Sequence, residues 1–230
     1  MTKLPAFENF PQKTVDFLKK LSKNNSREWF EKHRDEYNSQ FLEPAFQFVT
    51  EIGEKLSSIA PGIMAVPRID KSVFRLHRDV RFSKDKSPYK TNLGILLWEG
   101  KNKLESSGFY FHLDTKGYFL GAGIYMPSKE QLKIFRDAVS DTILGKELNS
   151  SVNKVLKKGN YSIGGKTYKK IPKGYDPASP NAEFLLYNGL YAYSESQDFN
   201  DLTKYDIVDL VFKKYKDMLP VHQWLLKIFT

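Results

Sequence analysis

The residues best suited to chemistry lie close together in the segment 75–91. The segment contains six basic and two acidic residues, interrupted by Phe82, Pro88 and Tyr89. The basic residues are Arg75, Arg78, Arg81, Lys84, Lys86 and Lys90, and the acidic residues are Asp79 and Asp85. Arginine presents a planar fork of donors that pairs with a carboxylate or phosphate through two parallel hydrogen bonds. The segment is therefore a candidate site for an anionic group.

The charges of this segment allow three interpretations. Two acids cannot neutralise six cations, and the excess is four positive charges. In the first interpretation the ions form an internal network and the excess is solvated. In the second, which we favour because no catalytic pair is evident, the cations bind an anionic ligand. In the third, Asp79, Asp85 or His77 moves a proton while the cations stabilise developing negative charge.

Alternating polarity over 72–82 predicts a strand, and the residues after it predict a stiff turn. Arg78 falls among the apolar positions of that strand, so it should be partly buried with a carboxylate or several carbonyl groups as partners. Asp85 is placed to accept a hydrogen bond from the backbone two residues later, and Pro88 restricts the residue before it to extended geometry. Such a turn would hold its side chains in fixed positions.

The residues predicted to bind the ligand come from two basic tracts. The second tract is lysine-rich, since residues 148–175 contain seven lysines and no acid. The predicted ligand-binding residues are Arg75, Arg78, Arg81, Lys86, Tyr89, Lys90, Lys170 and Tyr175. Tyr89 is expected to stack on a ring of the ligand. Residues 169–176 of the long loop 159–180 are either a lid over the segment 75–91 or a solvated connector. The expected partner is an anionic small molecule or, in second place, a nucleic-acid backbone.

No motif for a metal or a cofactor is present. The chain has no cysteine, which excludes disulfides, thiolate catalysis and cysteine-ligated metal sites. Its four histidines lack the spacing typical of metal ligands, and no P-loop or dinucleotide fingerprint occurs. We therefore expect no metal site and no cofactor. Mg²⁺ held by Asp79 or Asp85 together with substrate phosphates needs little sequence signature and is compatible with the sequence.

Hydrophobic periodicity predicts a single α+β domain over residues 1–230, with helices from both ends packed on a mostly antiparallel sheet. Helices are expected at 11–23, from Asn25 with a capping box to Glu28, from Glu43 to Pro61, after Ser128 with a capping box to Gln131, at 146–158, and from about Thr203 to a break at Pro220. Strands are expected at 72–82, 92–98, 107–113, 118–125 and 189–195, with a hairpin at 161–168. The apolar segment 221–229 either docks on the domain or forms a homodimer contact.

Four stretches of the sequence resemble a widespread microbial family of uncharacterised proteins, catalogued as a domain of unknown function. The hallmark is R-D-x-R-F-S-x-D-K-S-P-Y-K-T, which this chain carries from Arg78 to Thr91. The other three stretches lie at 24–37, 108–127 and 169–176. In their order and spacing, the four stretches span most of the chain, from residue 24 to residue 176. The resemblance implies one conserved domain and implies no activity, substrate or catalytic residue.

Composition and hydropathy define the remaining expectations. The chain has a formal charge of +9 and 40% hydrophobic residues, which is enough apolar material for a core. It has no run of about 18 apolar residues and no apolar leader, so we expect a cytoplasmic protein that does not enter a membrane. The expected function is the binding of a phosphate- or carboxylate-bearing ligand, and the alternative is an enzyme that acts on a phosphate-bearing substrate.

Overall fold

The computed structural model describes residues 7, 9–204 and 206–229. It has the predicted α+β architecture, with helices and one antiparallel sheet of six strands in the order β1-β2-β3-β4-β6-β5. The chain divides into two compact units. The first comprises residues 1–97, 110–119 and 195–212, and the second comprises residues 98–109, 120–194 and 213–230. The single domain expected over 1–230 stays a prediction.

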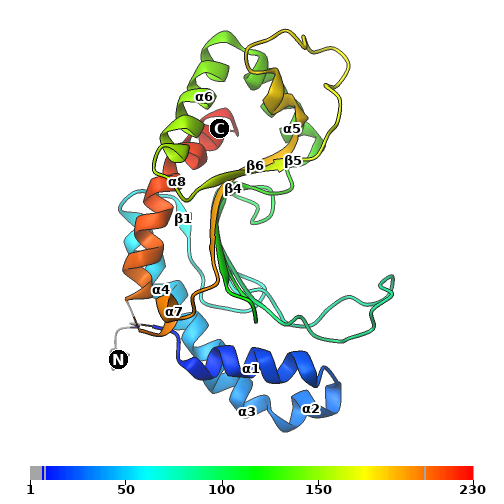
Figure 1. Ribbon diagram of the computed structural model, residues 1–230, viewed down its shortest axis with the longest axis vertical. Helices are drawn as coiled ribbons and strands as arrows, with labels where there is room; N and C mark the ends of the chain where they lie inside the picture. Colours follow the sequence, from blue (N-terminus) through cyan, green and yellow to red (C-terminus); the bar gives the residue numbers. More distant parts are fainter. Residues whose placement is uncertain (1–6, 8, 205, 230) are drawn as a thin grey trace. The chain divides into compact units, whose positions relative to one another are not determined.

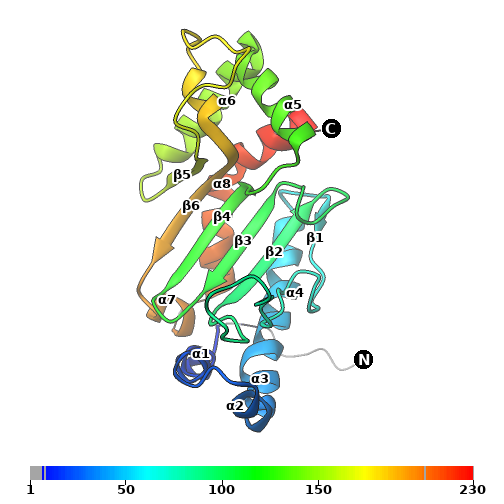
Figure 2. The same ribbon diagram turned by 90° about the vertical axis from the view of Figure 1, so that its right-hand side faces the viewer.

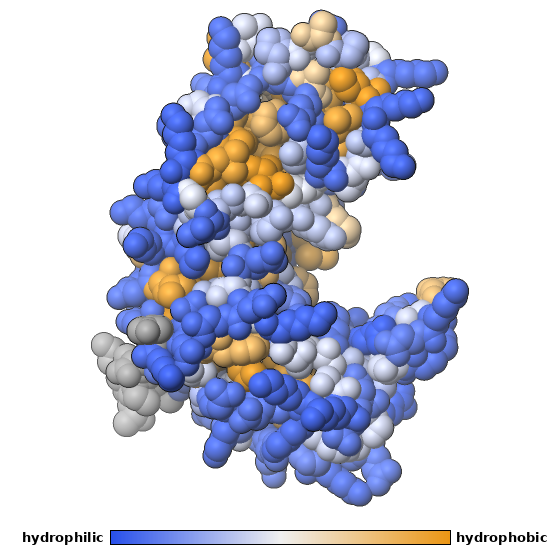
Figure 3. All heavy atoms as spheres, viewed as in Figure 1, coloured by the Kyte–Doolittle hydropathy of each residue, from blue (hydrophilic) through white to orange (hydrophobic). Residues whose placement is uncertain are grey.

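The first unit begins with a series of amphipathic helices (Figure 1). These are α1 (Gln12–Lys23), α2 (Arg27–Lys32), α3 (Arg34–Tyr37), the π-helical turn η1 (Asn38–Leu42) and α4 (Glu43–Ser57). Their buried residues recur at helical spacing, as Phe17 and Leu21 do in α1 and Phe48 and Ile52 do in α4. The charged residues face solvent, and the outer surface of these helices is mainly hydrophilic (Figure 3).

The strands of the sheet lie side by side (Figure 2). They begin with β1 (Ile63–Met64), β2 (Leu93–Glu99), β3 (Gly108–Leu113) and β4 (Tyr118–Ile124). Phe111 of β3 packs on Phe10 and on Phe48 of α4, with ring centroids 5.5 and 5.0 Å apart. Because side chains alternate along a strand, Tyr110 and His112 lie on the opposite face, which we call the polar face.

The second unit contains α5 (Lys129–Ser140), α6 (Thr142–Leu156), β5 (Ser162–Lys166) and η2 (Ala182–Leu186). Ser128 and Gln131 form the predicted capping box of α5: each backbone N–H donates to the other side chain, at 3.0 and 3.2 Å. β5 pairs antiparallel with β6 (Tyr187–Ser196). The strand predicted at 189–195 is thus confirmed as part of β6, whereas the hairpin predicted at 161–168 is wrong, because β5 takes β6 as its partner.

The strand predicted at 72–82 is wrong. Only its first residues pair with β2, where Phe74 N–H donates to Gly94 O at 2.9 Å. Beyond them the chain folds back on itself, and Lys90 N–H donates to Leu76 O at 2.7 Å. An alternating pattern produces a strand only where a partner strand supplies a run of hydrogen bonds. After its first residues this segment is paired with its own returning part through an isolated antiparallel bridge between His77 and Tyr89, which is too short to form a strand.

The capping box predicted between Asn25 and Glu28 is also wrong. The N-cap of α2 is Ser26, whose Oγ accepts a hydrogen bond from Trp29 N–H at 3.2 Å. Serine and asparagine cap helices equally well, so the sequence does not decide between adjacent candidates. The amide group of Asn25 is used elsewhere, as described below.

The chain closes with α7 (Asn200–Thr203) and α8 (Ile207–Phe229). The break predicted at Pro220 is wrong, since α8 continues through it. Val221 and Trp224 are buried, and Trp224 Nε1–H donates to Leu144 O at 2.9 Å. This packing stabilises the helix beyond Pro220, although proline removes one backbone hydrogen bond. This is the predicted docked arrangement of 221–229, and the homodimer contact stays a prediction. No described helix combines the length and the apolar character needed to cross a membrane.

Candidate functional site

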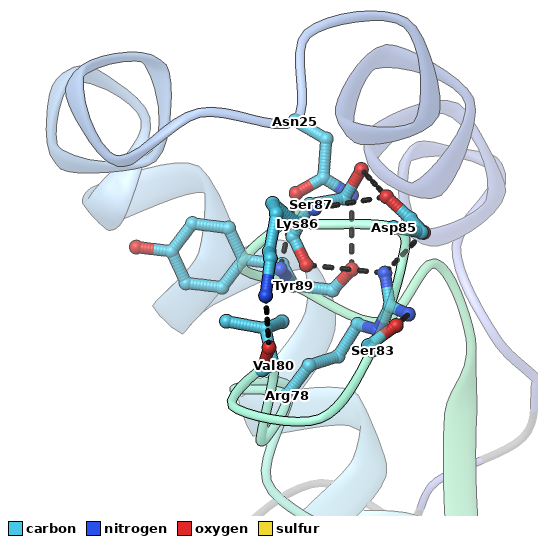
Figure 4. A network of polar contacts seen from close by, with 8 residues as sticks. All are labelled: Asn25, Arg78, Val80, Ser83, Asp85, Lys86, Ser87 and Tyr89. Atoms are coloured by element: carbon cyan, nitrogen blue, oxygen red, sulfur yellow. Dashed lines mark hydrogen bonds and ion pairs between the residues drawn. The ribbon is translucent and has the colours of Figure 1, made fainter.

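Asn25 closes the base of residues 75–91, which we call the basic loop. Asn25 Nδ2–H donates to Tyr89 O at 2.9 Å, and Tyr89 N–H donates to Asn25 Oδ1 at 3.0 Å (Figure 4). The amide side chain thus supplies both hydrogen bonds that a partner strand would give to Tyr89. Because Asn25 immediately precedes the cap of α2, this contact ties the loop to the helical part of its unit.

The ring of Tyr89 belongs to the core. It is 3% exposed and stacks on Phe30 of α2, with centroids 4.2 Å apart and an interplanar angle of 18°. His77 meets the same ring edge-on at 4.9 Å and is itself exposed. Burial, followed by the charge of Glu31, raises the pKa of Tyr89. The phenol therefore packs the basic loop against α2 and stays protonated at neutral pH.

Arg78 links several parts of the basic loop (Figure 4). Its guanidinium forms an ion pair with Asp85 and donates to Ser87 O at 3.1 Å and Ser83 Oγ at 3.4 Å. The side chain is 26% exposed, which confirms the expectation that a partly buried Arg78 has a carboxylate and a carbonyl group as partners. Asp85 Oδ1 also accepts from Ser87 N–H at 2.9 Å, as the predicted turn requires. Hydrogen bonds from Ser87 and then Arg78 hold the pKa of Asp85 well below its usual range.

Arg81 and Asp79 form a second ion pair in the loop. Arg81 Nε and Nη2 donate to the two carboxylate oxygens of Asp79 at 3.0 and 2.7 Å. Both side chains are largely exposed, so this pair adds little stability. Hydrogen bonds from Arg81 lower the pKa of Asp79. Asp79 and Asp85 are therefore ionised partners of arginines, and the alternative that they or His77 carry protons stays a prediction.

Ion pairing leaves part of the positive charge uncompensated. Among the described residues, the cations of the basic loop that have no carboxylate partner are Arg75, Lys84, Lys86 and Lys90. Lys84 and Lys86 are exposed, and Lys86 Nζ donates to Val80 O at 3.0 Å. The surface of the loop is mainly hydrophilic (Figure 3), although the ring of Phe82 is 95% exposed.

Lys90 and Arg75 are neighbours at the base of the loop. Lys90 is half-buried, and its amino group lies over the ring of Phe74, 5.7 Å from the centroid. Burial and then the charge of Arg75, opposed by Asp70, lower the pKa of Lys90. Arg75 is exposed. The two cations therefore repel each other, and neither forms an ion pair with a carboxylate among the described residues, although the charge of Asp70 favours that of Lys90 and the charge of Arg75 favours that of Asp79.

A row of hydrogen-bonding side chains continues along the polar face. Tyr110 Oη and Asn92 Nδ2 lie 3.2 and 3.5 Å from His112 Nδ1. His112 Nε2 lies 3.7 Å from Asp114 Oδ2. This network assigns the lone pair of His112 to Nδ1 and its N–H to Nε2. Burial, opposed by Asp114, lowers the pKa of His112, so its imidazole is mainly neutral at pH 7.

Phe74 connects this row to the two cations. Its ring meets that of Tyr110 edge-on, with centroids 6.3 Å apart, and also lies under the Lys90 amino group. Gly94 leaves room for both rings, because an added Cβ there would lie 3.1 Å from Tyr110 Oη and 3.2 Å from Phe74 Cδ2. Arg75, Lys90, Phe74, Asn92, Tyr110 and His112 thus form one group, which we call the polar-face cluster.

Residues 13–224 match the model of a family described as conserved hypothetical protein (DUF2461). The chain belongs to the DUF2461 family. This membership confirms the resemblance to an uncharacterised family that the sequence motifs predict. Among curated proteins, none matches the chain.

Most of the polar-face cluster of this DUF2461 chain is missing from the sequence-based site. The residues that sequence reasoning did not select are Phe74, Asn92, Tyr110 and His112. One signal for them exists: Tyr110, His112 and Asp114 occupy every second position, which places them on one face of a strand. The proximity of Asn92 and Phe74 to that face depends on the pairing of β2 with its neighbours, which the spacing alone does not give.

Lys170 and Tyr175 lie in the second unit of the DUF2461 chain. Lys170 is exposed. Tyr175 is half-buried, and its hydroxyl donates to Asp137 Oδ1 on α5 at 2.9 Å. Burial, followed by this hydrogen bond, raises the pKa of Tyr175. The loop 159–180 is thus fastened to α5 of its own unit, and its role as a lid and the ligand contacts of Lys170 and Tyr175 stay predictions.

The second unit also contains a hydrogen-bonded Ser–His–Glu chain. Ser107 Oγ lies 2.8 Å from His222 Nδ1, and His222 Nε2 lies 3.0 Å from Glu99 Oε2. This connectivity is that of a nucleophilic triad. Ser107 and His222 are, however, only 1% and 0% exposed, so a ligand does not reach the hydroxyl. These two hydrogen bonds join the segment 99–107 to α8, so the Ser–His–Glu arrangement is structural.

No group of three or more histidine, aspartate or glutamate side chains in the described part of the DUF2461 chain could hold a metal ion. Asp79 and Asp85 each face an arginine instead of each other. A Mg²⁺ ion bound by either carboxylate would therefore depend on phosphates of a ligand to complete its coordination.

Proposed function

We propose that the protein binds a small anionic ligand, bearing a phosphate or a carboxylate, at Arg75 and Lys90. The observation that carries the proposal is the uneven use of the six cations in the basic loop. Arg78 and Arg81 are paired with Asp85 and Asp79, whereas Arg75 and Lys90, at the base of the loop, form no ion pair with a carboxylate among the described residues. An anion between these two cations would relieve their repulsion.

The chemistry of the two side chains suits an oxyanion. The Arg75 guanidinium can pair with two oxygens of a phosphate or carboxylate at once, and the Lys90 ammonium adds a compact point charge. Because Lys90 is half-buried, its interaction with an anion is screened less than that of a fully exposed lysine. Asn92, Tyr110 and His112 offer further donors and acceptors for the rest of the ligand.

In this proposal the other predicted binding residues shape the loop. Arg78 uses its donors on Asp85, Ser83 and Ser87. Tyr89 is buried against Phe30. These side chains hold the base of the loop, which begins at Arg75 and ends next to Lys90, in one conformation. Their contribution to binding is therefore positional.

Calorimetric titration with inorganic phosphate and pyrophosphate tests the proposal. We expect both anions to bind the wild-type protein and Lys90→Gln to weaken binding about tenfold, the effect of one charged hydrogen bond. Lys84→Gln is the matched control, because Lys84 is an exposed cation of the same loop without a carboxylate partner among the described residues. If both variants lose the same affinity, binding depends only on the net charge of the loop and not on the position of Lys90, which would contradict the proposal.

A nucleic-acid backbone is the second candidate, supported by the exposed ring of Phe82. A ring that is 95% exposed, beside the cations Arg81, Lys84 and Lys86, is suited to stack on an unpaired base. Fluorescence anisotropy with a labelled single-stranded oligonucleotide tests it. This candidate requires affinity that falls steeply with salt and weakens in Phe82→Ser. A salt-insensitive affinity that is unchanged in Phe82→Ser would exclude it.

A further inference from the structure

Arg136 of α5 differs from the other arginines of the chain, because it is half-buried and forms no ion pair with a carboxylate among the described residues. Arg34, Arg78 and Arg81 each pair with an acid, and the remaining arginines are exposed. Arg136 Nε is buried without a hydrogen-bond partner. Its two terminal nitrogens make no hydrogen bond to a described residue and, unlike Nε, are reached by solvent. Since buried donors are normally paired, this guanidinium has unused capacity for hydrogen bonds.

Two tyrosines hold the long lysine-rich loop beside Arg136. The guanidinium carbon Cζ lies over the ring of Tyr168, 5.0 Å from the centroid. Tyr168 Oη donates to Asn188 Oδ1 at 3.2 Å, and Tyr175 Oη donates to Asp137 Oδ1 at 2.9 Å. The loop is thus fastened to α5 and to β6. Stacking on Tyr168 orients the guanidinium and leaves the N–H groups at its edge available to an anion.

The same loop carries further positive charge directly after Tyr168. Its exposed lysines that form no ion pair with a carboxylate among the described residues are Lys169, Lys170 and Lys173. Asp176 is the only acid of the segment 169–176. The loop therefore has an excess of positive charge, which attracts a partner of negative charge.

We infer that Arg136, Tyr168 and the lysines that follow it form a docking surface for an acidic peptide segment of a partner protein. Arginine and tyrosine supply much of the binding energy at the centre of protein interfaces, whereas charges at the rim steer association. A glutamate or aspartate carboxylate would accept two hydrogen bonds from the edge of the Arg136 guanidinium. The surface lies in the second unit and does not depend on the proposed function.

The surroundings of Tyr168 favour a peptide over other anionic partners. Its ring already lies against Arg136 and its hydroxyl is bonded to Asn188, so it is less free to stack on a base than Phe82 is. Tyr168 is 40% exposed and the lysines of the loop are exposed as well. Small-molecule sites instead enclose most of their ligand in a concave pocket.

Fluorescence anisotropy with a dye-labelled poly-glutamate peptide tests the inference on the full chain. We expect the wild-type protein to bind the peptide and Arg136→Gln to weaken binding about tenfold, the effect of one charged hydrogen bond. Arg136→Lys keeps the charge but loses the fork of donors, so it should not restore wild-type affinity. Melting curves show whether each variant is folded. Because Arg136 has no ion pair to lose among the described residues, Arg136→Gln should melt close to the wild-type temperature.

Arg75→Gln is the matched control, because it removes an exposed arginine of the first unit that also forms no ion pair with a carboxylate among the described residues. It should leave the affinity for the peptide unchanged. Equal losses in Arg136→Gln and Arg75→Gln, or no binding by the wild-type protein, would overturn the inference. Tighter binding of a single-stranded oligonucleotide of equal charge, also weakened in Arg136→Gln, would assign the surface to nucleic acid and overturn the peptide. Each of these results leaves the proposed function to its own titration with phosphate.

Discussion

The tip and the base of the basic loop use the same residue types in different ways. In the tip, Arg78 and Arg81 each face an aspartate, and backbone carbonyl groups accept from Arg78 and Lys86. At the base, Lys90 lies over the aromatic ring of Phe74, and the charge of Arg75 lowers the pKa of Lys90. The comparison teaches that a high density of charged residues is not enough to identify a binding site, because some of these charges pair with each other. The candidate site lies at the base, where neither cation has an ion-pair partner among the described residues and Lys90 is half-buried, whereas the unpaired lysines of the tip are exposed. The paired residues maintain the loop that holds the candidate site.

The largest expected effect on stability comes from removing the ring of Tyr89, which packs the basic loop against α2. Tyr89→Ala should lower the free energy of unfolding by about 3–5 kcal/mol, because it removes a large buried ring stacked on Phe30. Urea denaturation measures this change. Tyr168→Ala is the control, since that ring is 40% exposed and its loss should cost less than about 1 kcal/mol. Similar losses in the two variants would show that Tyr89 does not anchor the loop.

The next largest effect is expected from removing the two hydrogen bonds between Asn25 and Tyr89 at the base of the loop, which we call the clamp. Asn25→Ala should lower the free energy of unfolding by about 1–3 kcal/mol, because the N–H and C=O groups of Tyr89 both lose their partner. Phosphate affinity should fall as well, since the base of the loop then becomes mobile. Asn24→Ala removes an exposed hydrogen bond to Lys20 O and should leave the affinity unchanged. A stable Asn25→Ala protein with normal affinity would contradict the positional role of the clamp.

A smaller effect is expected within the tip. Asp85→Asn should lower the melting temperature, because the charge that pairs with Arg78 is lost. The folded-state pKa of Asp85 is depressed, so its stabilising contribution is fully present above the ordinary aspartate pKa of about 3.9 and disappears as the pH falls below it. The difference in melting temperature between wild type and variant should therefore be full at neutral pH and shrink in acid. Asp79→Asn should destabilise less, because that pair is more exposed.

Binding distinguishes the structural and catalytic interpretations of Asp85. If the carboxylate serves Arg78, Asp85→Asn should keep or raise the phosphate affinity, since one negative charge has left a cationic loop. If instead Asp85 carries a proton or a Mg²⁺ ion, the variant should be fully stable and lose ligand binding. Melting curves and calorimetry of the same sample decide between the two.

The smallest effect on stability is expected from replacing Lys90. The folded-state pKa of Lys90 is depressed, so its charge destabilises the fold at neutral pH, and this penalty fades as the pH rises towards the ordinary lysine pKa of about 10.4. Lys90→Met should therefore raise the melting temperature slightly at pH 7 and less at pH 10. Lys84→Met, at an exposed position, should show no such trend. A gain for Lys90→Met that grows with pH would contradict the assigned environment.

The sequence predicts local features of the site well. A charged residue at an apolar position requires a partner, and Arg78 has Asp85. An aspartate two residues before a serine predicts a turn, and Ser87 N–H donates to Asp85. The alternating apolar pattern also identifies strands near 92–98, 107–113 and 118–125. In each case the interacting residues lie within about ten positions of each other in the sequence.

Features that depend on distant residues escape such reasoning. Asn25 binds Tyr89 across a separation of 64 residues, although its position before a helix suggests a cap. The segment 72–82 has the pattern of a strand, but beyond Phe74 it leaves β2 and pairs only briefly with residues 88–90. Pro220 does not break α8, because burial of the residues around it outweighs a missing hydrogen bond. Tertiary contacts override the local preference in all three.

The most direct test of the account compares Arg75 with Arg81, one arginine from the base and one from the tip. Calorimetric titration with inorganic phosphate would be carried out on wild type, Arg75→Gln and Arg81→Gln under one salt concentration. Both variants lose one positive charge, one from an arginine without an ion-pair partner among the described residues and one from the arginine that pairs with Asp79. We predict that Arg75→Gln weakens phosphate binding about tenfold or more and that Arg81→Gln changes it less than about twofold. Equal affinities in the two variants, or a larger loss in Arg81→Gln, would contradict the account.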